Sequence, residues 1–285
     1  MKKISPSTDF TYLPIGIFDS GLGGLTVYRQ IRTLLPSENI IYLGDTARVP
    51  YGSKSTATIR DFTSQITRFL LNQPVKALVI ACNTASSLAL DVVMTLTHLP
   101  VINVIEPGVL EALRLTQRKR VGVIGTRATI ESEAYPKKIH EYDPSLQVYS
   151  VPCPLFVPLV EEGWEHHLVT KMIAEEYLNP LISLAIDTLI LGCTHYPILK
   201  PVLQTILPLN VTIVDSSQVV AQAVRHALEA LNLLNPQTIP GTDLFYVTDF
   251  PRKFTAISSR FLGYELKNIQ KISIETLSQY SQQNP

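Results

Sequence analysis

The sequence carries the same order of strand ends twice, and this repeat limits the possible folds more than any other feature. The segment Val79–Thr84 matches Ile190–His195 at an offset of 111 residues, and both contain a cysteine at the fourth position. Three more pairs recur at offsets of 106, 108 and 110 residues: Ile15–Ser20 with Val121–Thr126, Ile40–Asp45 with Val148–Cys153, and Val101–Glu106 with Val211–Ser216. Four matches in the same order at nearly constant offset indicate a duplicated half.

Short apolar runs alternate with segments of helical period in each half, which is typical of β/α units around a mainly parallel sheet. The predicted strands are Ile15–Phe18, Ile40–Leu43, Leu78–Ala81, Val101–Ile105, Val121–Ile124, Val148–Val151, Leu189–Leu191 and Val211–Val214. The predicted helices are Leu25–Leu35, Thr56–Leu71, Ala85–Leu96, Glu165–Leu178 and Val219–Leu231. We therefore expect an α/β protein built from two similar halves.

The length of 285 residues exceeds the size at which one hydrophobic core stops growing, so two domains are expected. The first half of the repeat holds residues 1–104, and the second holds residues 105–215. The segment after residue 216 is too short for a third unit. Its helical stretch Val219–Leu231 is expected to pack back onto one of the two halves.

Composition excludes several classes of protein. The 24 basic and 24 acidic residues balance, which argues against a nucleic-acid binder. No apolar run reaches the roughly 18 residues that span a bilayer. Polar residues follow Lys2 and Lys3 where a signal peptide needs an apolar stretch, so we expect a cytoplasmic protein that does not associate with membranes. Three widely spaced cysteines and six scattered histidines predict neither a disulfide framework nor a metal site.

The repeat singles out two of the three cysteines. Cys82 and Cys193 each follow an apolar strand and precede a residue able to cap a helix, and a helix N-terminus lowers the pKa of a thiol. Free cysteines are also commonly small buried hydrophobic residues. Packing alone does not explain thiols at two equivalent strand ends, so the duplication favours a functional pair. Cys153 matches Asp45 instead of a cysteine and is interpreted as structural.

Two loops after predicted strands are further candidates. The glycine-rich loop Asp19–Gly24 either offers N–H groups to an anion or is a tight turn with Asp19 as a helix cap. It is neither G-x-G-x-x-G nor a P-loop. In the second loop, Tyr51 and Gly52 either offer a hydroxyl and N–H groups to a ligand or only shape the connection. His195 lies two residues beyond Cys193, so a Cys/His pair is sterically possible.

These segments together resemble the glutamate racemases, cofactor-independent members of the aspartate/glutamate racemase superfamily. The resemblance covers Ile15 to about Phe261. It rests on Gly16–Gly24, Gly44–Gly52, Ala81–Thr84, Val104–Gly108, Pro154–Glu161 and Leu191–Pro197. It implies two pseudo-symmetric α/β domains with mainly parallel sheets and an active site in the cleft between them. It also implies that residues 216–285 complete the first domain, which leaves residues 105–215 as the second.

The resemblance also implies roles for individual residues. Cys82 and Cys193 match the two catalytic thiols, on opposite faces of the bound amino acid. Asp19 and His195 match residues that assist the thiols, and Glu161 matches a nearby carboxylate, although the adjacent Glu162 leaves open which one points inward. The implied substrate contacts are Asp19, Ser20, Tyr51, Gly52, Asn83, Thr84, Thr194 and His195. No metal is implied, and the family commonly forms homodimers.

The expected reaction is the racemisation of L-glutamate to D-glutamate, which supplies bacterial peptidoglycan synthesis. Removing the α-proton from one face and returning a proton to the other needs two acid–base groups, which explains a repeated thiol. No strand-end motif offers a lysine for pyridoxal phosphate, so no cofactor is expected. Two alternatives remain: a Cys/His hydrolase that uses Cys193 and His195, and a non-catalytic binder of small molecules.

Overall fold

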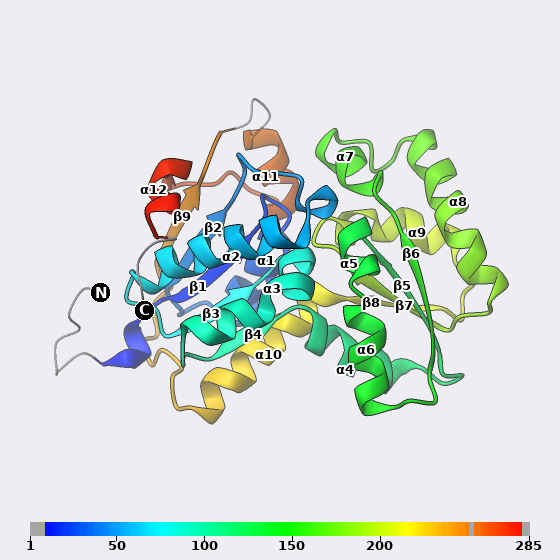
Figure 1. Cartoon of the computed structure of the whole chain (residues 1–285), viewed down its shortest axis with the longest axis horizontal. Coiled ribbons are helices and arrows are strands. Elements are labelled where there is room, and N and C mark those ends of the chain that lie inside the picture. The colour runs from blue at the N-terminus through cyan, green and yellow to red at the C-terminus, as the bar shows by residue number, and fades with distance from the viewer. Residues whose placement is uncertain (1–8, 251–253, 281–285) are drawn as a thin grey trace.

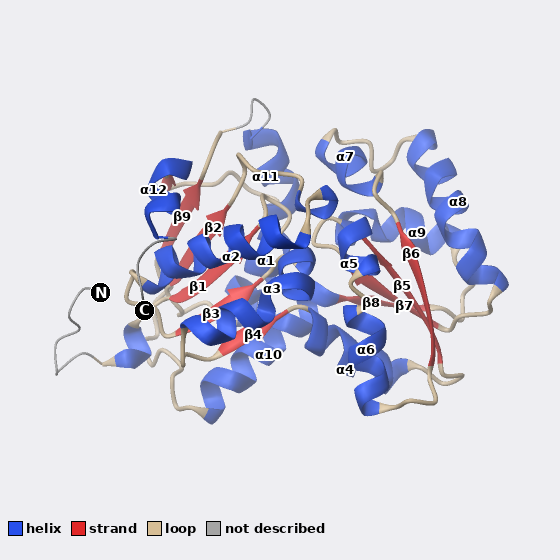
Figure 2. Ribbon diagram, viewed as in Figure 1, coloured by secondary structure: helices blue, strands red, loops and turns tan. Residues whose placement is uncertain are grey.

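The chain forms two separate parallel sheets (Figures 1 and 2). The structure, a computed structural model, describes residues 9–250 and 254–280. The strand order is β10-β9-β2-β1-β3-β4 in the first sheet and β6-β5-β7-β8 in the second. Every pair of neighbouring strands among the described residues is parallel. The predicted class, an α/β fold with two parallel sheets, is confirmed.

Each of the eight predicted apolar runs overlaps a strand. The first sheet holds β1 (Ile15–Asp19), β2 (Ile40–Gly44), β3 (Ala77–Ile80), β4 (Val101–Asn103), β9 (Asp243–Val247) and β10 (Ile269–Lys271). The second sheet holds β5 (Arg120–Gly125), β6 (Gln147–Pro152), β7 (Thr188–Gly192) and β8 (Thr212–Asp215). The run predicted to extend to Ile105 ends two residues earlier, because the side chain of Asn103 accepts a hydrogen bond from the Ile105 N–H and starts a helix there.

Helices lie on both faces of each sheet and include all five that were predicted (Figure 2). The helices are α1 (Leu25–Leu34), α2 (Thr56–Leu71), α3 (Asn83–Leu96), α4 (Ile105–Leu115), α5 (Arg127–Glu131), α6 (Ala134–Tyr142), α7 (Phe156–Glu161), α8 (Leu168–Ser183), α9 (Lys200–Ile206), α10 (Ser216–Ala230), α11 (Phe254–Leu262) and α12 (Ile274–Gln279). Three 3₁₀ turns are η1 (Phe10–Tyr12), η2 (Tyr51–Ser53) and η3 (Tyr196–Leu199). Among the described helices, none is long and apolar enough to cross a membrane.

The duplication seen in the sequence is also a duplication of topology. The four repeated strands have the spatial order β2-β1-β3-β4 in one sheet and β6-β5-β7-β8 in the other. In each copy, the strand that comes second in the sequence therefore lies at one end of the four, next to the first, followed by the third and the fourth. In both sheets a repeated cysteine follows the third strand of the copy: β3 ends two residues before Cys82, and β7 ends directly before Cys193. The C-terminal strands β9 and β10 extend only the first sheet, beyond β2.

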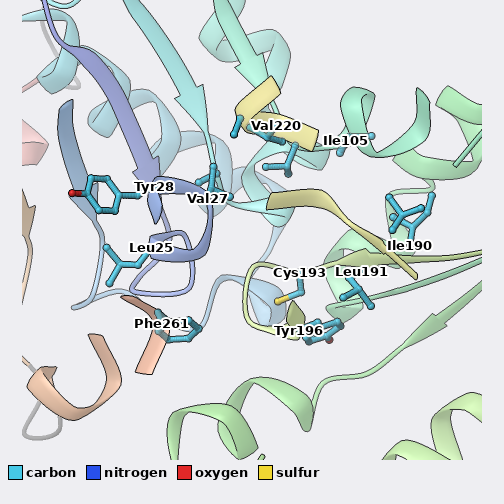
Figure 3. Packing of buried hydrophobic residues seen from close by; sticks show 14 of the residues in the cluster. Leu25, Val27, Tyr28, Ile105, Ile190, Leu191, Cys193, Tyr196, Val220 and Phe261 are labelled. Carbon is cyan, nitrogen blue, oxygen red and sulfur yellow. The ribbon is translucent and has the colours of Figure 1, made fainter. Parts of the chain in front are cut away.

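The chain passes between the sheets twice, from β4 into α4 and from β8 into α10. Figure 1 shows α10 and α4 close together where the two halves meet. A single hydrophobic cluster runs through this junction (Figure 3). It includes Leu25 and Tyr28 from α1, Ile105 from α4, Val220 from α10 and Ile190 from β7. Shared burial of these side chains therefore holds the two sheets together.

A buried lysine anchors the connection between α10 and β9 to the first sheet. Lys76 is 1% exposed, and its Nζ donates to the carbonyl oxygens of Thr11 at 2.6 Å and Leu233 at 2.8 Å. Its Nζ also lies 2.5 Å from a carboxylate oxygen of Glu38. The other oxygen of Glu38 accepts from the N–H of Asn235. Burial lowers the pKa of Lys76, and the adjacent Glu38 opposes that shift.

The substitution Lys76→Met is expected to lower the free energy of unfolding by about 3–5 kcal/mol, because it leaves the Glu38 carboxylate buried without its counter-charge. Urea unfolding followed by circular dichroism measures this loss. The double variant Lys76→Met/Glu38→Gln removes the unpaired charge and is expected to recover part of it. A single variant as stable as the unmodified protein would contradict the prediction.

Candidate active site

The carboxyl ends of the two sheets border one cavity of about 350 Å³. Ten of the eleven predicted site residues line it. The first sheet and its loops contribute Ser20, Tyr51, Gly52, Cys82, Asn83 and Thr84. The second sheet and its loops contribute Glu161, Cys193, Thr194 and His195. The eleventh, Asp19, lies at the end of β1 and is completely buried.

Asp19 stabilises the loop that leads into α1. Its Oδ2 accepts hydrogen bonds from the N–H groups of Gly21 and Gly24, both at 2.9 Å. Its Oδ1 is buried without a hydrogen-bond partner. Burial raises the pKa of Asp19, while the hydrogen bond from Gly24 and the nearby His195 oppose this shift. The side chain therefore holds the glycine-rich loop together and leaves one oxygen unsatisfied, while the N-cap of α1 is Gly24, so Asp19 is not the helix cap that one interpretation expected.

Cys82 is a protonated thiol. It occupies the N-cap of α3, where its Sγ accepts from the Ala85 N–H at 3.5 Å, and it is 4% exposed. The helix N-terminus was expected to lower its pKa. Instead, burial raises the pKa of Cys82 to about 12, and the negative charge of Asp19 adds to that effect. Loss of water around the sulfur outweighs the helix terminus, so this expectation was wrong.

Cys193 lies in a different electrostatic environment. Its Sγ is 3.9 Å from Nδ1 of His195, and Nε2 of the same ring is 3.0 Å from Oε1 of Glu161. Burial on its own lowers the pKa of His195, but the hydrogen bonds to Cys193 and Glu161 outweigh it and raise the pKa to about 10. His195 is therefore a cation at neutral pH. Glu161, rather than Glu162, is the carboxylate that contacts it.

Polar side chains from both halves meet on the α3 side of the cavity. The hydroxyl of Thr84 is 3.0 Å from that of Thr126 and 3.4 Å from that of Thr129. Asn83 accepts from the Tyr135 hydroxyl through Oδ1, while its Nδ2 is buried without a partner. These groups, with the free N–H groups at the start of α3, suit a carboxylate ligand.

The sequence-based prediction missed Thr126 and Arg127, which also line the cavity. The internal repeat contained a signal for the first of them. Thr126 ends the segment that matches Ile15–Ser20, so it is the counterpart of the predicted Ser20. No comparable signal marks Arg127.

The hydroxyl of Tyr51 is not available to a ligand as one interpretation expected, because it donates to the carboxylate of Asp45. Asp45 is buried and also accepts from Nε of Arg48 at 2.6 Å and from the hydroxyl of Thr248 at 2.9 Å. These bonds fix the loop that carries Gly52 against the cavity. The loop therefore presents its backbone and the buried ring of Tyr51 to the cavity, while the Tyr51 hydroxyl has a structural role.

Two glycines let loops of the first sheet touch the second. A Cβ atom on Gly23 would lie 2.4 Å from Nδ1 of His195 and 2.4 Å from the hydroxyl of Thr194. A Cβ atom on Gly52 would lie 2.6 Å from Cβ of Thr126. Any side chain at either position would force these atoms apart. Close backbone approach is therefore required to form the cavity.

The arrangement is suited to proton transfer by sulfur. Two thiols reach one cavity from two sheets, one protonated and the other beside a cationic imidazole. Within residues 9–250 and 254–280, no three His, Cys, Asp or Glu side chains gather as a metal ion would require.

The Asp/Glu/Hydantoin racemase family model matches residues 15–224, a range that contains both thiols and the loops around the cavity. The chain belongs to this family. It is therefore an isomerase, and the resemblance noted in the sequence is confirmed by its relatives. The glutamate racemase of Syntrophus aciditrophicus is 48% identical over 274 residues, which cover 96% of this chain and 100% of the relative. That of Geobacter metallireducens is 46% identical over 261 residues, 92% of this chain and 97% of the relative.

Solved structures agree with this racemase over nearly its whole length. The glutamate racemase of Francisella tularensis, crystallised with D-glutamate, has a TM-score of 0.89 and 44% identity, covering 93% of this chain and 99% of that one. The Thermus thermophilus glutamate racemase, crystallised with β-chloro-D-alanine, has a TM-score of 0.84 and 45% identity. The match covers 93% of this chain and 99% of that one. The similarity therefore spans both sheets and the cavity between them.

We predict that iodoacetamide at pH 8 modifies Cys193 more than about tenfold faster than Cys82. Burial raises the pKa of Cys82 to about 12, so little of it is ionised at pH 8, whereas Nδ1 of the cationic His195 ring lies 3.9 Å from Sγ of Cys193. Cys153 is fully buried and is expected to react last. Mass spectrometry of peptides over time gives the three rates.

The variant Cys193→Ser is the control for this labelling. It should leave the slow rate of Cys82 unchanged, because each sulfur reacts independently. Faster modification of Cys82 than of Cys193 in the unmodified racemase would show that the electrostatic difference has the opposite sign.

Proposed function

We propose that this racemase interconverts L- and D-glutamate without a cofactor, using Cys82 and Cys193 as its two acid–base groups. One observation carries the proposal: both thiols line the same cavity, and each follows the equivalent strand of a duplicated sheet. The relatives named glutamate racemase, one of them crystallised with D-glutamate, support glutamate as the substrate.

Racemisation requires one thiolate and one thiol at any moment. The thiolate takes the α-hydrogen as a proton from one face of the amino acid, leaving the electron pair on the α-carbon. The thiol then gives its proton to the opposite face, and the two sulfurs have exchanged protonation states. In the free enzyme, the His195 ring lies beside Cys193, and Cys82 holds its proton. We assign Cys193 to L-glutamate and Cys82 to D-glutamate.

The carbanion is stabilised by hydrogen-bond donors at the substrate carboxylates. Hydroxyls of Ser20, Thr84 and Thr194 line the cavity, and the unpaired Nδ2 of Asn83 is buried beside it. Thr126 faces Thr84 from the second sheet. Donors from both sheets therefore hold an amino acid with two carboxylates without a bound metal or pyridoxal phosphate.

Three charged side chains assist the thiols. The negative charge of Asp19 raises the proton affinity of Cys82. His195 places a positive charge beside Cys193, and Glu161 holds the other nitrogen of its ring. The two sulfurs therefore have neighbours of opposite charge before substrate binds.

We propose the domain boundaries predicted from the sequence: residues 1–104 with 216–285, and residues 105–215. Each sheet takes its strands from only one of these parts. Helix α4 packs on β7 and β8 of the second sheet, while α10 packs mainly on α1 of the first. The family resemblance further supports a cytoplasmic homodimer that supplies D-glutamate for peptidoglycan.

The hydrolase alternative has some geometric support, because Cys193, His195 and Glu161 lie in the order nucleophile, base and acid. A hydrolase of that kind gives no role to Cys82, which lines the same cavity. Membership of a racemase family accounts for both thiols, so racemisation is the better proposal.

The purified protein, without added pyridoxal phosphate or metal, is expected to racemise both enantiomers of glutamate and to exchange the α-hydrogen in heavy water. Cys82→Ala and Cys193→Ala are each expected to reduce turnover by about 10²–10⁴-fold, because each removes one acid–base group. Cys153→Ala, a buried cysteine outside the cavity, is the matched control and should retain full activity. Full activity in either of the first two variants would refute the two-thiol mechanism.

Glutamate is expected to exceed aspartate in kcat/KM by at least about 10²-fold, because the shorter side chain leaves buried donors of the cavity unpaired. Thr126→Val removes one donor and should raise KM for glutamate more than it changes kcat. Thr205→Val, at an exposed hydroxyl on α9, serves as the control. Equal kcat/KM values for aspartate and glutamate would contradict the prediction that donors in the cavity select for the longer side chain.

A further inference from the structure

Helix α11, between β9 and β10, contacts the end of α7, although the two helices belong to different proposed domains. Figure 1 shows α11 and α7 facing each other across the junction of the two halves. Nη1 of Arg260, on α11, donates to the carbonyl oxygens of Val160 at 2.9 Å and Glu161 at 3.2 Å. Its Nε lies 3.3 Å from Oε1 of Glu165. One guanidinium of the first domain therefore caps a helix of the second.

We propose that Arg260 is a positioning residue for the racemase reaction: it fixes Glu161 in place and, through Glu161, it fixes His195. The inference rests on the proposed function, in which His195 assists Cys193. Glu161 is held at both ends: its backbone carbonyl accepts from Arg260, and its carboxylate contacts Nε2 of His195 at 3.0 Å. A shift of the backbone at Glu161 therefore moves the partner of the imidazole.

The helix that carries Glu161 needs such a contact. Helix α7 has only six residues, so it contains few internal hydrogen bonds and depends on its surroundings for its position. The last carbonyl groups of any helix lack partners within the helix. Arg260 supplies donors to two of them at the point where Glu161 ends α7.

The packing around Arg260 leaves little freedom for the guanidinium. Gly163 follows α7 with φ of +79°, and a Cβ atom there would lie 2.4 Å from Nη2 of Arg260. The adjacent Phe261 packs edge-on against the imidazole of His195, with ring centroids 5.2 Å apart. Figure 3 shows Phe261 in the same part of the core as Cys193. Helix α11 therefore contacts both members of the His195–Glu161 pair.

The contact forms only when the two domains are in this arrangement, because Arg260 and Glu161 lie on opposite sides of the junction. No equivalent helix follows the strands of the second sheet, which has no counterpart of β9 or β10. Arg260 should therefore affect the half-reaction at Cys193 more than the half-reaction at Cys82.

The variant Arg260→Gln is expected to lower kcat in both directions by about ten- to a hundredfold, with a smaller change in KM, because the His195–Glu161 pair loses its fixed geometry. The deuterium isotope effect is measured separately on α-deuterated L- and D-glutamate. It should rise for the enantiomer that Cys193 deprotonates and fall for the other. Arg260→Lys keeps the charge and some donors, so it should recover part of kcat.

Arg32 provides a closely matched control in the first domain, away from the cavity. Its Nη1 donates to two carbonyl oxygens, of Pro36 at 2.9 Å and Glu38 at 2.7 Å, and its Nη2 pairs with Asp243. Its side chain is 17% exposed, against 25% for Arg260. Arg32→Gln should lower the Tm as Arg260→Gln does while leaving kcat and both isotope effects unchanged.

Turnover of glutamate by the unmodified protein is measured first and tests the proposed function alone. The role of Arg260 is judged on ratios of variant to unmodified enzyme. It is overturned if Arg260→Gln retains kcat and both isotope effects, or if Arg32→Gln lowers kcat equally for the same loss of Tm. If Arg260→Gln does not fold, Arg260→Lys decides: unchanged isotope effects on both enantiomers would overturn the proposal.

Discussion

The contact of first-sheet loops with second-sheet strand ends is the constraint on which the site depends. At Gly23 the backbone approaches His195 so closely that no Cβ atom fits, and Gly52 does the same against Thr126. Larger residues would separate the two sheets and carry Cys82 away from Cys193. The cavity therefore depends on glycine backbone of the first sheet packing directly on side chains of the second, while the shared hydrophobic cluster supplies the attraction.

The duplicated fold places two thiols in unequal surroundings. Equivalent strand ends place both sulfurs at the cavity, but the neighbouring charges differ in sign. Asp19 lies near Cys82 and favours its protonated form, whereas cationic His195 lies beside Cys193. In the proposed mechanism one sulfur accepts a proton while the other donates one, and these neighbours distinguish the two sulfurs.

The apolar runs and the internal repeat were enough to predict eight of the ten strands that the described residues form, and the position of both thiols. The repeat could not predict β9 and β10, because neither has a counterpart in the second sheet, and β10 has only three residues, two of them polar. The hydrogen-bond partners of individual side chains also could not be predicted from the sequence. The bond from Tyr51 to Asp45, and the burial that raises the pKa of Cys82, depend on tertiary contacts that no local pattern records.

The part of the chain without a counterpart in the repeat accounts for much of the remaining asymmetry. Helix α11 lies between β9 and β10, which extend only the first sheet. From there it reaches the Cys193 side of the cavity, where Arg260 donates a hydrogen bond to the carbonyl oxygen of Glu161 and Phe261 packs against the ring of His195. An exact duplication would leave both thiols in equal surroundings. The added C-terminal segment supports one imidazole and its carboxylate, so it adds to the difference between the two sulfurs that Asp19 and His195 create within the repeat.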